Sequence, residues 1–283
     1  MDTFSVARYT YSICLFSPAI RVLLGIRSSL SHDAALLLRG ADPAPCVLNA
    51  ENIPADSPFF VVFNHYDHPG LGSWWGIAPI VATIAAHRTC EPHEIHLMMA
   101  REWYYPSGFD HWVKQPLTHW FFGQFAKTYN GIGLPPALDM EQFRGQGASA
   151  IRHALALTRA NPPEIIAVSP EGNTGSNLGL CRPPHGAGLM LMLLTYDAIP
   201  FLPVGIFQDK TERVHVNFGK PFRLNVPRQL SKAERDREAS RQVMIQIGTL
   251  LPERMHGVYR QDIVTMENKP GQECQINDRH LSD

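Results

Sequence analysis

The sequence carries no excess of positive charge and no basic block. Its 25 Lys and Arg residues against 26 Asp and Glu residues give a formal net charge of −1 over 283 residues. Proteins that bind nucleic acid usually gather Lys and Arg on one face or in one run. We therefore expect no nucleic-acid partner.

Cysteines are few and unpatterned. The five of them are scattered, odd in number and never in a Cys-x-x-Cys arrangement. This is typical of a protein in a reducing compartment rather than of one stabilised by disulfide bonds. We expect a cytoplasmic protein.

Long apolar runs are also missing. Residues 10–26 are rich in apolar side chains, but Pro18 and Arg21 interrupt them and no small-residue cleavage site follows. The pattern predicts neither a signal peptide nor a spanning helix. Any contact with a membrane is expected to be peripheral.

Three common catalytic patterns are incomplete. His65, Asp67 and His68 would fit a two-metal hydrolase motif only with a histidine at Phe63, so no metal is expected. The glycines of 70–72 are followed by a third glycine one residue too late for a dinucleotide turn, and 145–149 misplaces the serine of a hydrolase elbow. No cofactor is expected.

Apolar strand-like segments alternate with helical ones along most of the chain. The expected strands are 59–63, 95–99, a short one around Ile132, 164–168, 199–206 and 214–218; the expected helices are 74–87 (with Ser73 as its cap), one from Asp139 to about Ala160, 186–197, and one that begins at a capping box of Ser231 and Glu234. This alternation predicts an α/β fold with a mixed, largely parallel sheet flanked by helices. We assign 1–44 to an N-terminal helical segment, 45–260 to the α/β domain, and 261–283 to a polar tail without fixed structure.

The strand at 59–63 ends abruptly in polar residues. Five apolar residues predict a strand buried on both faces, and Asn64 and His65 follow it directly. Ligands in α/β folds bind beyond the carboxyl ends of such strands. An imidazole placed there suits proton transfer, so we expect His65 to act as a general base.

A second strand mouth carries hydroxyl groups, glycines and one carboxylate. Glu171, Gly172, Asn173 and Thr174 follow the strand 164–168 and could offer backbone N–H donors and an acidic group. An ordinary surface loop has the same composition, so this segment alone does not decide between the two.

Aromatic residues are dense between 109 and 129. Trp112, Trp120, Phe121, Phe122 and Phe125 could line a groove the size of an acyl chain, but a well-filled core is the favoured interpretation.

The N-terminal segment contains an amphipathic pattern. A helix is expected to begin at Ser17 and Pro18 and to place Ile20, Leu23, Leu24 and Leu30 near one face, with Arg21 and Arg27 off it. Such a helix lies either on a membrane surface or against its own domain with both arginines solvated.

Three motifs resemble those of the glycerolipid acyltransferase family, the lysophosphatidate-type enzymes, in order and spacing. They are Val62-Phe63-Asn64-His65, Ser169-Pro170-Glu171-Gly172 and Ile199-Pro200-Phe201-Leu202-Pro203-Val204, flanked by 52–54 and 217–222. The resemblance covers about residues 45–225. It implies that family's α/β fold and an enzyme of phospholipid biosynthesis that moves a fatty acyl group from acyl-CoA or acyl carrier protein to a hydroxyl of a lipid or polyol. It also implies that His65 is the base, with Asn64 and Glu171 shaping the substrate site.

The sequence departs from the family at the residue that orients the histidine. The family has Asp five residues after the histidine, whereas this chain has Gly70. Loss of an orienting carboxylate from a catalytic triad costs roughly 10⁴ in turnover. Asp67 is the nearest carboxylate along the chain, and a backbone carbonyl is the other candidate acceptor for the imidazole N–H.

A second departure concerns phosphate binding. Neither position that carries the family's phosphate-binding arginines has one here: the segments are 130–134 and 171–175. Guanidinium groups hold phosphate best. Either Arg101 or Arg182 reaches the acceptor from another direction, or the acceptor is not phosphorylated.

Two other functions stay open. The first is a non-catalytic lipid-binding relative, which is favoured if no carboxylate or carbonyl lies within hydrogen-bond reach of His65. The second is an acyl-thioester hydrolase that uses water as acceptor.

Overall fold

A seven-stranded sheet forms the centre of the protein. The computed structural model describes residues 6–68, 70–91, 94–136, 147–172, 179–195 and 199–267. The sheet has the strand order β3-β9-β8-β4-β7-β5-β6, and a separate two-stranded sheet joins β1 to β2. The strands are β1 (Arg8–Tyr9), β2 (Ala41–Asp42), β3 (Cys46–Leu48), β4 (Phe60–Phe63), β5 (Ile95–Ala100), β6 (Ile132–Leu134), β7 (Ile165–Val168), β8 (Phe201–Gln208) and β9 (Val214–Phe218).

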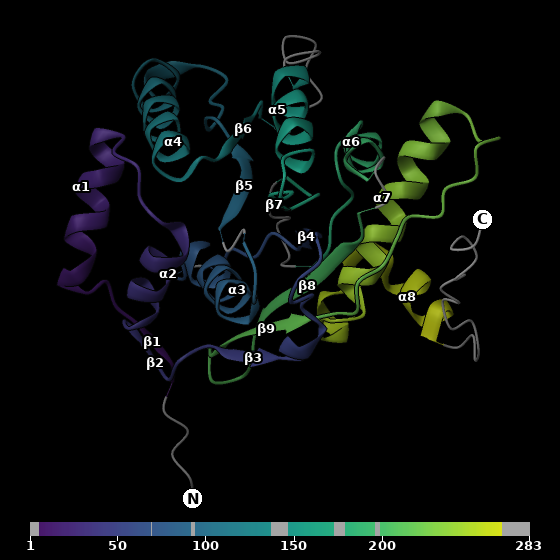
Figure 1. The fold of residues 1–283 in the computed structure, drawn as a ribbon, viewed down its shortest axis with the longest axis horizontal. Helices are drawn as coiled ribbons and strands as arrows, with labels where there is room; N and C mark the ends of the chain where they lie inside the picture. The colour runs from purple at the N-terminus through teal and green to yellow at the C-terminus, as the bar shows by residue number, and fades with distance from the viewer. Residues whose placement is uncertain are drawn as a thin grey trace, which may run out of the picture.

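Neighbouring strands of the large sheet run parallel except β8 and β9, which are antiparallel. The predicted α/β class with a mixed, largely parallel sheet is confirmed (Figure 1). The two central strands, β4 and β7, consist entirely of buried apolar residues. Such continuous apolar runs are what a sheet covered on both faces requires.

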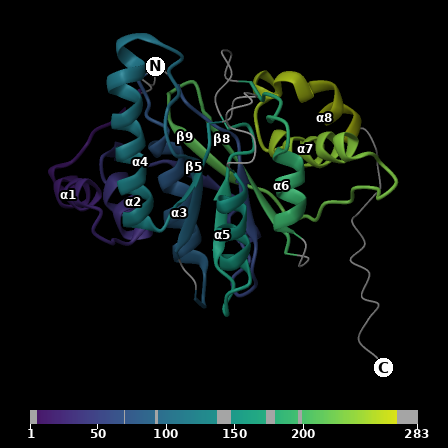
Figure 2. The same ribbon diagram turned by 90° about the horizontal axis from the view of Figure 1, so that it is seen from above.

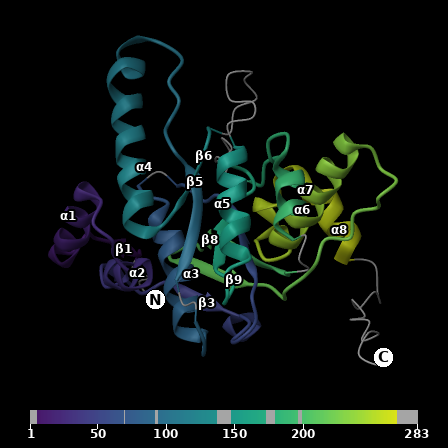
Figure 3. The same cartoon turned by 45° about the horizontal axis from the view of Figure 1, so that its top comes forward.

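Helices cover both faces of this sheet. Helices α2 and α3 lie on one face and α5, α6 and α7 on the other (Figure 2). Figure 3 shows α1, α2 and α4 at one end of the sheet and α7 and α8 at the other. The helices are α1 (Phe16–Leu24), α2 (Leu30–Leu38), α3 (Trp74–His87), α4 (Gln115–Tyr129), α5 (Ala148–Thr158), α6 (Ala187–Leu194), α7 (Lys232–Gly248) and α8 (Arg260–Glu267), and a π-helical turn, η3 (Asp110–Lys114), leads into α4.

Several predicted helix ends can be compared directly. Helix α3 spans the predicted 74–87, although Ser73 makes no side-chain cap, and α7 begins with the predicted capping box of Ser231 and Glu234. The predicted cap Asp139 lies outside the described residues. Residues 261–267, expected in an unstructured tail, form most of α8 instead, because Ile263 is completely buried there.

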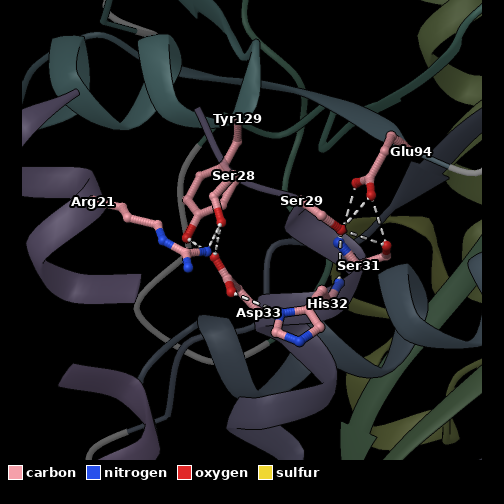
Figure 4. A network of polar contacts seen from close by, with 8 residues as sticks. All are labelled: Arg21, Ser28, Ser29, Ser31, His32, Asp33, Glu94 and Tyr129. Atoms are coloured by element: carbon pink, nitrogen blue, oxygen red, sulfur yellow. Dashed lines mark hydrogen bonds and ion pairs between the residues drawn. The ribbon is translucent and has the colours of Figure 1, made fainter. Parts of the chain in front are cut away.

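The N-terminal segment forms two helices rather than one. Gly25 ends α1 with a φ of 63°, which favours glycine, and α2 starts only at Leu30. A buried polar network then fixes both helices (Figure 4). Asp33 accepts hydrogen bonds from Ser28 Oγ at 2.7 Å and from the Tyr129 hydroxyl at 2.9 Å, and Arg21 donates to Ser28 Oγ at 3.0 Å. This network joins α1, α2 and α4.

The same segment is tied to β5 by a second carboxylate. Glu94, just before β5, accepts hydrogen bonds from the Ser29 hydroxyl and from the backbone and hydroxyl of Ser31 (Figure 4). Ser29 also caps α2 by accepting a hydrogen bond from the His32 N–H. In the part of the chain that the structure describes, no helix combines the length and apolar character needed to cross a bilayer.

The aromatic segment 109–129 does not form a filled core. Phe125 is buried, but Trp112 is 79% exposed and Trp120 and Phe121 are exposed as well. The core interpretation is wrong for most of these side chains, because only one side of α4 faces the rest of the protein.

Candidate functional site

Register brings three of the predicted site residues to one edge of the sheet. Val62 of β4 is paired with Val168 of β7, which is paired with Met98 of β5. His65, Glu171 and Arg101 each come three residues after one of these paired positions. Since neighbouring strands are about 4.8 Å apart, parallel strands leave such residues in one row beyond their carboxyl ends.

Asn64 sets the direction in which the chain leaves β4. The last residue pair of β4 with β8 is Phe63 with Val204. Beyond it, the Asn64 amide donates to the Ile206 carbonyl at 2.9 Å and accepts from the Ile206 N–H at 2.7 Å. The side chain is buried, so it continues the strand pairing in place of backbone. Both polar groups of the Asn64 side chain are used in these bonds, so the structure gives no contact that supports its predicted role in binding substrate. Asn64 instead positions the next residue, His65.

Glu171 joins the two sides of the site. Its Oε2 accepts a hydrogen bond from the His65 backbone N–H at 2.9 Å, and its Oε1 accepts one from the Cys181 N–H at 2.7 Å. The carboxyl group therefore holds the backbone of His65, not its imidazole ring. This bond fixes the backbone position from which the imidazole side chain extends.

Burial changes the pKa of this carboxyl group. The Glu171 side chain is only 6% exposed, and this desolvation raises its pKa to about 7, against the opposing effect of the two N–H donors. A buried carboxyl group with a pKa near neutrality is common where proteins handle protons.

The His65 imidazole is kept neutral. Burial lowers its pKa below the ordinary value, while the negative charge of Asp67 opposes this effect. The Nδ1 atom is buried and has no hydrogen-bond partner among the described residues. Asp67 is exposed and does not replace the missing aspartate, because it makes no hydrogen bond to Nδ1.

Gly70 stands in open space with a φ of +88°. This backbone conformation favours glycine over any residue with a side chain. The position at which the resembled family has its aspartate thus adopts a geometry that suits glycine.

The two candidate arginines come from different segments. Arg101 follows β5, and its Nε is 3.5 Å from the Glu102 carboxylate. Arg182 is exposed and follows Cys181, whose N–H binds Glu171. Gly172 is exposed, with a φ of 69°, in a turn closed by its N–H to Ser169 O; Asn173 and Thr174 lie outside the described residues.

Two supporting contacts were not predicted from the sequence. The Tyr66 hydroxyl donates to Gln208 Oε1 at 3.0 Å and holds the turn after His65 against the end of β8. The Cys181 N–H binds Glu171, ten residues away in sequence. The position of Tyr66 directly after His65 could have suggested the contact with Gln208. The contact between Cys181 and Glu171 involves a backbone N–H and leaves no signal in the sequence.

The fold and this edge define an α/β protein with a neutral histidine and a buried acid at the mouth of neighbouring parallel strands. No group of three or more His, Cys, Asp or Glu side chains suited to a metal ion occurs within the described ranges. What the arrangement can do chemically is take a proton from a bound hydroxyl or water.

Comparisons with known proteins find similarity among solved structures. No protein-family model and no curated protein matches the chain. Among solved structures, it is similar to the crystal structure of the 1-acyl-sn-glycerophosphate (LPA) acyltransferase PlsC from Thermotoga maritima, with a TM-score of 0.42 and 16% sequence identity over 91% of each chain.

Proposed function

We propose that this protein is an O-acyltransferase that moves a fatty acyl group from a thioester of coenzyme A or acyl carrier protein to a hydroxyl of a lipid or polyol. One observation supports this most: a neutral imidazole and a buried carboxyl group occupy the same row at the carboxyl edge of the sheet, within the motifs of a glycerolipid acyltransferase. Because Nδ1 is buried, Nε2 is the nitrogen that would take the proton.

The reaction is a direct exchange at the carbonyl carbon. As the acceptor oxygen attacks, its proton passes to His65, the new ester C–O bond forms and the C–S bond breaks. The imidazolium then returns the proton to the leaving thiolate. No redox or metal chemistry is required.

The unpartnered Nδ1 makes this a slow catalyst. In a triad, the acceptor on this nitrogen fixes the tautomer and stabilises the imidazolium, and its loss costs roughly 10⁴ in turnover. Wild-type turnover is therefore expected far below that of an enzyme with a complete dyad.

Peripheral attachment to a membrane forms part of the proposal. On α1, Arg21 points inward to Ser28, whereas Ile20, Leu23 and Leu24 are exposed. Only one of the two arginines, Arg27, is exposed, and the exposed Ile20, Leu23 and Leu24 support the membrane-surface interpretation.

A panel of acceptors tests the function. Release of free thiol from an acyl thioester is measured with no acceptor, with a neutral glyceride and with a glycerol phosphate ester. Release that requires an acceptor supports the transferase, and the preferred acceptor shows whether phosphate is recognised. If phosphate is preferred, Arg101→Ala and Arg182→Ala identify the arginine that binds it. Release at full rate without acceptor would instead identify a hydrolase.

A non-catalytic lipid-binding protein is the second candidate. The orphaned Nδ1 is the observation that favours it, because a histidine without an orienting partner is expected in a relative that has lost catalysis. No thiol release with any acceptor, together with binding of the lipid, would establish this function.

A further inference from the structure

Apolar side chains make up much of the exposed surface between Phe109 and Phe121, which covers η3 and the first half of α4, although Lys114 and His119 are exposed there as well. Six apolar residues there, here called the aromatic stripe, recur at the spacing of one helix face and all are exposed: Phe109, Trp112, Val113, Leu117, Trp120 and Phe121. Surface helices normally present polar residues to water. Here the arrangement is reversed.

The other side of α4 shows that this exposure is not caused by a detached helix. Phe125 packs on Trp74 of α3 with ring centroids 4.8 Å apart and on Tyr129 at 4.7 Å, and Tyr129 is held by Asp33. The carboxyl-terminal half of α4 is thus packed on the domain, and the exposed aromatic stripe lies on its amino-terminal half and on the turn before it.

The charges around the stripe suit a lipid surface. Asp110 pairs with Lys114 at 2.9 Å, and Glu102, whose side chain is largely buried, lies 3.5 Å from His119. Arg27 and Lys127 are exposed and line one hollow, whereas Arg21 is turned inward to Ser28. Exposed Trp and Phe beside basic residues is the composition that binds a bilayer interface containing anionic lipid.

The stripe is continuous with the exposed apolar face of α1. Gln124 of α4 donates to the Leu23 carbonyl at 3.1 Å, and Leu23 and Leu24 are exposed beside this contact. At its other end, the stripe begins where the chain returns from the carboxyl end of β5, the sheet edge that carries His65.

We propose that the aromatic stripe docks on a lipid bilayer containing anionic lipid, with its rings at headgroup depth, and so turns the His65 edge of the sheet toward the lipid. This inference rests on the proposed function for its choice of occupant. It assigns to α4, and not only to the N-terminal helix, the surface that contacts the membrane.

Vesicle co-sedimentation tests this without any acyl donor, so its outcome is independent of catalysis. The full chain is mixed with vesicles of phosphatidylcholine and phosphatidylglycerol. Leu117→Asp and Trp120→Asp should each lower the fraction bound, with the partition coefficient falling about tenfold, because each variant puts a charge where an apolar side chain would enter the bilayer. Leu193→Asp, at an exposed leucine of α6, is the matched control and should bind like wild type.

Two results would overturn the proposal. One is equal binding of wild type, both stripe variants and the control, or no binding of wild type at all. The other is a wild-type dimer in light scattering that Leu117→Asp dissociates without any change in vesicle binding, which would make the stripe a contact between two copies. Because all substituted side chains are exposed, thermal unfolding should confirm that each variant is folded.

Discussion

A single glycine decides how well His65 can work as a base. Gly70 has open space around its Cα, but its φ of +88° disfavours a side chain. Gly70→Asp should lower stability by about 1–2 kcal/mol, the cost of a non-glycine residue in this backbone region. If the new carboxylate reaches Nδ1, it should raise both the pKa of His65 and the rate of acceptor-dependent thiol release.

Gly70→Asn is the matched control for this gain. It meets the same backbone strain and has nearly the same shape, but it carries no charge. Kinetics and thermal unfolding of the two variants are compared directly. Equal rates for Asp and Asn would show that a carboxylate at position 70 does not assist the imidazole.

Glu171 should make stability depend on pH. Its pKa is raised from 4.5 to about 7 in the folded protein, so the folded state binds the proton more tightly than the unfolded state. The contribution is fully present below about pH 4.5 and is lost as the pH rises through about 7. The shift corresponds to about 3 kcal/mol.

Glu171→Gln removes this titration while keeping the shape of the side chain. Urea unfolding of both proteins at pH 5 and pH 8 should show the variant gaining relative to wild type at the higher pH. A difference that is the same at both pH values would mean that Glu171 does not titrate in this range.

The sequence predicted which residues reach the site but not how they are held. His65 and Glu171 could be placed because each follows a run of buried strand residues. The bonds from Asn64 to Ile206 and from Cys181 to Glu171 could not, because their partners are backbone groups brought near only by the fold.

At the scale of elements, amphipathic patterns predicted where helices form better than they predicted what each apolar helix face contacts. Periodicity shows that a helix has an apolar face, but not whether protein covers that face. Both α1 and α4 expose apolar residues that the same pattern would bury in an ordinary core helix. The strands β1, β2 and β3 were not predicted, because two or three residues carry no periodic signal; β6 is equally short and was predicted.

The Asp33 network should control how α1 and α2 are held against α4. Asp33→Ala leaves the buried hydroxyl of Tyr129 without its acceptor and breaks the link to Ser28, so we expect a loss of about 3 kcal/mol in the free energy of unfolding. Tyr129→Phe removes one donor only and should cost about 1 kcal/mol.

His32→Ala is the control for this network. The His32 ring also contacts Asp33, at 3.2 Å, but it is 64% exposed, so its loss should change stability by less than about 0.5 kcal/mol. Chemical denaturation measures all three. Equal losses for Asp33→Ala and His32→Ala would contradict the assignment of the buried bonds as the ones that hold the helices.

At the scale of the whole molecule, the proposed function links the sheet edge that carries His65 to the exposed apolar surfaces of α1 and α4. The predicted α/β core places His65 and Glu171 at the carboxyl edge, and the segment that carries the aromatic stripe follows β5, which ends at that edge. The overall sheet was predictable because its central strands are uninterrupted apolar runs; the exposed stripe was not, because aromatic density alone also describes a core.

Acceptor-dependent thiol release in His65→Ala, with Asp67→Asn as its control, decides whether this edge is catalytic. Loss of the base should lower the rate by roughly 10²-fold, since the missing carboxylate has already removed most of the effect of the histidine. Asp67→Asn should stay within about twofold, because Asp67 is exposed and acts only through its charge. Undiminished release in His65→Ala would show that the imidazole takes no proton from the acceptor.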